Sequence, residues 1–203
     1  MSIIIIVVTS VISIFSFSNK NLFNRLLFNP YQTRYKREWY RIVTHGFLHA
    51  NWVHLIVNMM VLFSFSGIIE SSFRLMAYRT WLKLPMLCYL VFYMMSIIVS
   101  SLITLRKHRD DFWYNSVGAS GAVSAVLFCS IFFEPNMTLL FMGVVPLKAF
   151  IFGPLYLLYS WYSARKENDN INHDAHLWGA VFGFCFPLIV DPRMIQWFIG
   201  KLL

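Results

Sequence analysis

The sequence has few charged residues and few breaks in its apolar blocks. Of its 203 residues, 13% are charged and 58% are hydrophobic, whereas a soluble domain carries about 25% charged residues. This shortage argues against an ordinary soluble domain and indicates a multi-pass integral membrane protein. The length leaves room for one membrane domain and for no separate soluble one.

Acidic residues are especially scarce. The chain has 9 Asp and Glu against 17 Lys and Arg, which gives a formal charge of +8. A basic excess can indicate nucleic-acid binding, but these basic residues lie between apolar blocks and not on one polar module. We therefore expect contact with anionic membrane lipids and no nucleic-acid partner.

Cysteine is scarce too. Cys88, Cys129 and Cys185 lie inside apolar runs without CxxC spacing, which is typical of packed small hydrophobic residues and not of a disulfide framework. The first apolar block, Ile3–Phe17, has no basic segment before it and no A-x-A-like site after it. A retained first span is therefore favoured over a cleaved signal peptide.

The apolar blocks predict an all-α chain that forms one domain over residues 1–203. The connection at about 19–50 mixes basic and large apolar residues, which is typical of an element that lies in the membrane interface. If each span crosses the membrane, the second, fourth and sixth spans begin on the same side. The expected spans are about 3–17, 52–69, 85–105, 118–133, 148–161 and 173–190.

Ser120 and His176 stand in the first turns of the fourth and sixth spans, at similar depth. A serine hydroxyl is a poor nucleophile without an adjacent base, and histidine is the usual base at neutral pH. Taken singly, each residue is better explained by helix packing or by the headgroup region. Small residues that would let the two helices approach are Gly118 and Gly121 on one span and Gly179 and Gly183 on the other.

Donors for a developing oxyanion are also present. His54 and Asn58 are four residues apart on the second span, so they share one helix face. The Ser120 backbone N–H lies in a first helical turn and lacks an intrahelical acceptor. Asp174 is two residues from His176 and faces elsewhere on a helix, so the residues predict a Ser–His dyad without a cofactor.

Taken together, these motifs resemble the rhomboid family of intramembrane serine proteases. The resemblance covers about residues 35–190, and Glu70 and the stretch Glu38–Arg41 are similar to further family positions. The motifs that carry it are His54-x-x-x-Asn58, Gly118-Ala119-Ser120-Gly121 and Ala175-His176-x-x-Gly179-x-x-x-Gly183.

The resemblance implies a six-helix transmembrane bundle of rhomboid type that cleaves transmembrane segments of other membrane proteins. It implies Ser120 as nucleophile, His176 as general base and His49 as a supporting residue. It also implies a lateral gate at the fifth span, with residues 163–172 as a cap. The N-terminus would lie on the cytoplasmic side of a bacterial-type plasma membrane, although most of the 17 Lys and Arg would then lie outside, against the positive-inside tendency.

Two positions depart from the family pattern. The family often has an aromatic residue that stacks on the base four residues after the nucleophile, where this chain has Ser124. His173, one turn before His176, is a rival base, but only His176 has the family spacing to the glycines.

Two alternatives to a protease remain open at the sequence level. His45, His49 and His54 could gather as metal ligands, although the stretch has no nearby carboxylate or cysteine ligand. The chain could also be a catalytically inactive rhomboid-like protein that binds membrane clients.

Overall fold

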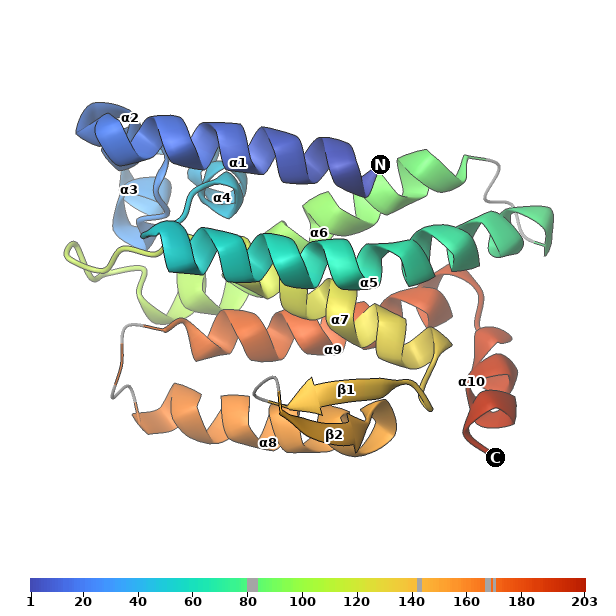
Figure 1. The fold of residues 1–203 in the computed structure, drawn as a ribbon. Helices are drawn as coiled ribbons and strands as arrows, with labels where there is room; N and C mark the ends of the chain where they lie inside the picture. Colours follow the sequence, from blue (N-terminus) through green and yellow to red (C-terminus); the bar gives the residue numbers. More distant parts are fainter. Residues whose placement is uncertain (80–83, 142–143, 167–168, 170) are drawn as a thin grey trace.

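The long helices lie in successive layers along one common direction in the computed structural model, with α7 in the middle (Figure 1). The structure describes residues 1–79, 84–141, 144–166, 169 and 171–203. The helices are α1 (Ser2–Ser18), α2 (Lys20–Leu26), α3 (Pro30–Tyr35), α4 (Arg41–Thr44), the 3-10 turn η1 (His45–Phe47), α5 (Trp52–Arg79), α6 (Pro85–Lys107), α7 (Ser120–Phe133), α8 (Ala149–Lys166), α9 (His173–Val190) and α10 (Met194–Leu202).

Three of these helices are long and apolar enough to cross a membrane: α5 over Trp52–Ala77, α6, and α9. The helices α1 and α7 are apolar but shorter. The fold is thus mostly helical with three candidate spans, and the count of six spans stays a prediction. The sixth expected span matches α9 at both ends, whereas α5 continues ten residues beyond the expected end at 69.

The expectation of an all-α chain misses one element. Strands β1 (Thr138–Phe141) and β2 (Val145–Lys148) form an antiparallel hairpin that leads into α8. Pro146 of β2 lies opposite Leu140 of β1. A proline has no backbone N–H and so donates no hydrogen bond to the partner strand. Strands of four residues with a proline give too weak a pattern to be predicted from sequence.

The connection expected at 19–50 folds into three short helices and the 3-10 turn. Arg41 is buried at its centre, where its guanidinium donates to Glu38 at 2.5 Å and to the carbonyls of Asn24 and Leu27 at 2.9 and 2.8 Å. A buried charge is tolerated when its hydrogen bonds are satisfied in this way. Through these contacts, Arg41 holds separate parts of the connection together near the start of α5.

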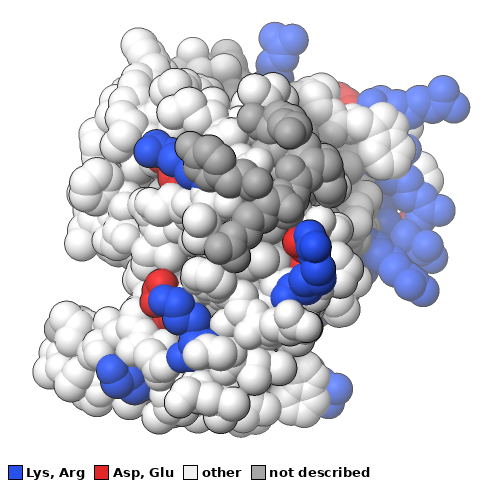
Figure 2. All heavy atoms as spheres, turned by 90° about the vertical axis from the view of Figure 1, so that its right-hand side faces the viewer, with Lys and Arg blue, Asp and Glu red and all other residues white. Residues whose placement is uncertain are grey.

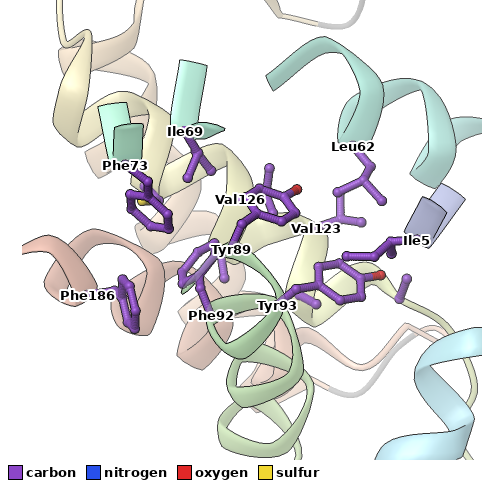
Figure 3. Packing of buried hydrophobic residues seen from close by; sticks show 14 of the residues in the cluster. Ile5, Leu62, Ile69, Phe73, Tyr89, Phe92, Tyr93, Val123, Val126 and Phe186 are labelled. Atoms are coloured by element: carbon purple, nitrogen blue, oxygen red, sulfur yellow. The ribbon is translucent and has the colours of Figure 1, made fainter. Parts of the chain in front are cut away.

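An aromatic strip on α6 forms the centre of the hydrophobic core. Tyr89, Phe92 and Tyr93 are fully buried and face side chains of α5, α7 and α9, with Phe73 and Phe186 among them (Figure 3). On α7, every residue after the first is buried. This packing holds α6 against α7 and α9, below the first turns of α7 and α9, where the candidate site lies.

Among the described residues that Figure 2 shows at the end of the bundle where α10 lies, most are uncharged. Its charges come in part as pairs, with Lys201 3.0 Å from Glu134 and Arg193 2.9 Å from Asp191. The candidate residues lie at the opposite end, where α5, α7 and α9 begin.

Candidate active site

Ser120 begins α7. The segment just before it is hydrogen-bonded to the connection at 19–50, called the first connection below. The backbones of Phe28 and Ser116 exchange two hydrogen bonds of 2.9 and 3.0 Å, and the Gly118 N–H donates to the His45 carbonyl at 3.1 Å. Ser120 is half-buried. As the first residue of the helix, it has a backbone N–H without an intrahelical acceptor.

Gly118 bends this segment against the first turn of α5. Its φ is +127°, and a Cβ at this position would lie 2.6 Å from Cε1 of His54. Only glycine adopts such a backbone conformation readily. The His54 ring therefore lies against the backbone two residues before Ser120. Gly118 contacts this ring, and its expected part in the contact with the sixth span stays a prediction.

Backbone-to-backbone packing joins α7 to α9. A Cβ added to Gly179 would overlap the Gly121 carbonyl, and a Cβ added to Gly183 would overlap the Ala125 carbonyl. Small residues at both positions allow this close approach. The expected helix contact through Gly121, Gly179 and Gly183 is therefore present.

The two predicted catalytic residues lie at one end of this contact. A Cβ at Gly121 would lie 3.2 Å from the carbonyl oxygen of Ala175, and these residues are the chain neighbours of Ser120 and His176. The structure thus brings both first turns together. Among the residues that the structure describes, no hydrogen bond joins the Ser120 hydroxyl to the His176 ring, and their catalytic roles stay a prediction.

The predicted oxyanion donors lie in the first two turns of α5. The Asn58 side-chain amide donates to the His54 carbonyl at 2.8 Å, and its second amide hydrogen is left for another acceptor. The His54 ring lies 5.0 Å from the His49 ring, nearly perpendicular to it. The two rings are thus neighbours, and the supporting role of His49 stays a prediction.

His45 and His49 each have a separate hydroxyl partner. His45 Nε2 lies 2.9 Å from Ser101 Oγ, and His49 Nδ1 lies 2.9 Å from Ser13 Oγ. Burial lowers the pKa of His45 to about 4 and that of His49 to about 3. Within the described part of the chain, no three His, Cys, Asp or Glu side chains are grouped to hold a metal ion. The geometry gives the metal-site alternative no support.

The rival base His173 is buried and faces a carboxylate. Its Nε2 lies 3.1 Å from both oxygens of Asp169, and this hydrogen bond lowers the pKa of Asp169. The His173 ring lies 5.8 Å from the His176 ring. Asp169 therefore contacts the histidine beside the predicted base and not the predicted base itself.

Ser124, which departs from the family pattern, has a partner that the sequence did not predict. Its buried hydroxyl lies 2.7 Å from the Tyr156 hydroxyl of α8. An aromatic side chain of another helix thus contacts Ser124. No spacing rule connects these two positions, because their contact depends on how α8 packs against α7.

Comparisons with known proteins show the family of this chain. The family model described as "Rhomboid domain" matches residues 36–193. RHOMBOID-like protein 12, mitochondrial, of Arabidopsis thaliana is 29% identical over 68% of this chain and 43% of its own length. Rhomboid-like protein 11, chloroplastic, of the same plant is 29% identical over 71% of this chain and 50% of its own length.

A bacterial relative is also similar. The protein named "Putative rhomboid protease YdcA" of Bacillus subtilis (strain 168) is 27% identical over 72% of this chain and 65% of its own length. The chain thus spans about two fifths to two thirds of the length of the curated relatives that it matches. Since the family model covers most of the chain and its helices are apolar, this integral membrane protein belongs to the rhomboid family.

Proposed function

We propose that the protein is an intramembrane serine endopeptidase with a Ser120–His176 dyad. The observation that carries the proposal is the contact between Gly121 and Ala175, which brings the first turns of α7 and α9 together. The Ser120 hydroxyl attacks the carbonyl carbon of a peptide bond and His176 takes its proton. His176 then gives this proton to the leaving amine, and water hydrolyses the acyl-enzyme.

The tetrahedral intermediate needs hydrogen-bond donors for its oxyanion. The proposed donors are the His54 ring, the second amide hydrogen of Asn58 and the Ser120 backbone N–H. Support comes from the position of His54 against Gly118, two residues before the nucleophile. No cofactor takes part in these steps.

The proposed substrates are transmembrane segments of other membrane proteins, and the proposed entry lies beside α8. A methyl group fits between this helix and α7, because a Cβ at Gly153 would meet Phe128 at an ordinary 3.6 Å. An apolar cavity of about 320 Å³ lies between α7, α8, α9 and α10. The Ser124–Tyr156 hydrogen bond ties α8 to the nucleophile helix near this route.

The proposed location is a bacterial-type plasma membrane with the N-terminus in the cytoplasm and basic residues near lipid headgroups. Residues 163–172 would cap the site from the side of the α9 start. Residues 167–168 and 170 of this cap lie outside the described residues.

A fluorophosphonate reagent, which reacts with activated serine hydroxyls, tests the dyad. We expect it to label the detergent-purified protein at Ser120 and to block cleavage of a model transmembrane substrate. His176→Ala should lower the labelling rate at least about a thousandfold, and Ser120→Ala should abolish labelling.

Two outcomes would refute the proposal. Labelling that persists in Ser120→Ala would place the reactive group elsewhere. A folded parent protein that is neither labelled nor active on a substrate, but retains that substrate through purification, would favour the inactive client-binding alternative.

A further inference from the structure

The side chain of Asn172 joins three parts of the bundle at the start of α9. Its Oδ1 accepts the Ala175 N–H at 3.0 Å and so caps the helix. Its Nδ2 donates to Thr104 Oγ1 of α6 at 3.0 Å and lies 3.4 Å from Ser116 Oγ. One amide group thus contacts the start of α9, the end of α6 and the segment before α7.

Both ends of this junction are fixed. Thr104 is 1% exposed, and the Ser116 backbone is held by its two hydrogen bonds to Phe28. An Asn172 side chain held at both places cannot shift without breaking contacts on α6 or on the first connection.

The junction stands four residues before each proposed catalytic residue. Ser116 precedes Ser120 by four residues, and Asn172 precedes His176 by four residues. The His176 N–H donates to the Asn172 carbonyl at 3.2 Å. A displacement of Asn172 relative to Ser116 is therefore transmitted directly to the base and the nucleophile.

The rings of Phe132 on α7 and Phe184 on α9 pack together well below the candidate site, with centroids 5.4 Å apart. Nearer the site, the two helices meet at glycines, which have no side chains of their own to interlock. The Lys107–Asp174 ion pair of 3.0 Å also lies near this end, but it is partly exposed and joins α9 only to α6. An exposed pair of this kind contributes little.

We propose that Asn172 is a positioning residue that sets the offset between His176 and Ser120 through its contacts with Ser116 and Thr104. The proposal rests on the proposed function, because the offset matters for catalysis only if these two residues react together. A displacement of about 1 Å can cost up to a hundredfold in rate.

Two substitutions at Asn172 separate positioning from helix capping. Asn172→Ser keeps a capping hydroxyl but is too short to contact Thr104 and Ser116. Asn172→Asp keeps the cap and offers a second oxygen that accepts from both hydroxyls. We expect Asn172→Ser to lower kcat about tenfold at little-changed KM, and Asn172→Asp to retain kcat within about threefold.

Asp174→Asn is the matched control, because it breaks only the ion pair with Lys107. We expect it to leave kcat within about twofold. Parental kcat in Asn172→Ser, or an equal loss in Asn172→Asp, would overturn the positioning role. If Asn172→Ser does not fold, the pair Thr104→Val and Ser116→Ala removes the same contacts and leaves the cap intact.

Hydrogen exchange tests the junction without any activity. We expect deuterium uptake over residues 114–123 to be faster in Asn172→Ser than in the parent, with unchanged uptake over residues 52–69. Equal uptake over residues 114–123 would overturn the junction. A parent that lacks serine reactivity would overturn the proposed function alone, and the exchange result would still decide the junction.

Discussion

At the scale of single residues, Gly118 has the most demanding position in the candidate site. Its φ of +127° is one that residues with a Cβ rarely adopt, and the His54 ring occupies the space where a Cβ would lie. The positive φ and the contact with the His54 ring are therefore two independent reasons why this position requires glycine.

Gly118→Ala should impair catalysis more than folding. We expect about 1–3 kcal/mol of strain and displacement of the His54 ring, which would lower the fluorophosphonate labelling rate about a hundredfold if His54 donates to the oxyanion. Labelling rate and thermal unfolding in detergent would be measured together. Gly200→Ala is the matched control, since a Cβ at Gly200 meets no atom within 4 Å. A parental labelling rate in Gly118→Ala would contradict this assignment.

The sequence identified the residue types of the site but not all their contacts. The spacing around Ser120 and His176 predicted two first turns at similar depth, and the structure places those turns together. The contacts of Asn172 and Tyr156 could not be predicted in the same way. An asparagine before a helix predicts a cap, whereas its partners on other elements depend on the packing of the bundle.

At the scale of elements, α7 contacts its two neighbours in different ways. Against α9, the glycine positions Gly179 and Gly183 touch the backbone of α7. Against α8, Gly153 has room for a methyl group beside Phe128. The same residue type thus stands at a tight contact on one side and at a loose contact on the other.

Alanine at these glycines should give effects of different size. Gly179→Ala and Gly183→Ala each force α9 away from α7, and overpacking of this kind costs about 1–3 kcal/mol or more. Gly153→Ala should change stability by less than about 1 kcal/mol, because its Cβ meets ordinary van der Waals distances. The midpoint of unfolding in mixed detergent micelles measures each effect.

Gly67 supplies a control within a helix. A Cβ at this position meets no atom within 4 Å, and alanine removes the cost of glycine in a helix, about 0.5–1 kcal/mol. We expect Gly67→Ala to be neutral or stabilising. Equal losses at Gly67, Gly153 and Gly179 would contradict the distinction between tight and loose contacts.

Long apolar helices were predictable because their signal extends over many residues. The boundaries of α9 follow from Asn172 at its start and from Asp191-Pro192 after its end. The hairpin of β1 and β2 was not predictable, because its strands are short and pair only with each other. The continuation of α5 to Arg79 was also missed, since the expected span ended at residue 69.

At the scale of the whole molecule, two buried histidines hold the first connection, residues 19–50, against α6 and α1. His45 contacts Ser101 of α6, and His49 contacts Ser13 of α1. Both rings are almost fully buried, and burial lowers their pKa from 6.5 to about 4 and about 3. Near neutral pH, both rings are uncharged in the folded protein.

Because these pKa values are lower in the folded protein than in the unfolded chain, the free energy of unfolding decreases as the pH falls. Between pH 6.5 and about 4, the unfolded chain binds protons at His45 and His49 that the folded chain does not bind. Stability is therefore complete above pH 6.5 and decreases as the pH falls, by up to about 1.4 kcal/mol per pH unit for each histidine.

His49→Asn isolates one of the two contributions. Asparagine can keep a hydrogen bond to Ser13 Oγ but does not titrate, so the slope of stability against pH should decrease by about one proton. Unfolding midpoints between pH 5 and 8 in detergent give this slope, and they avoid the range where most carboxylates titrate. An unchanged slope in His49→Asn would mean that His49 is protonated in the folded protein, which would contradict its burial beside Ser13 and His54.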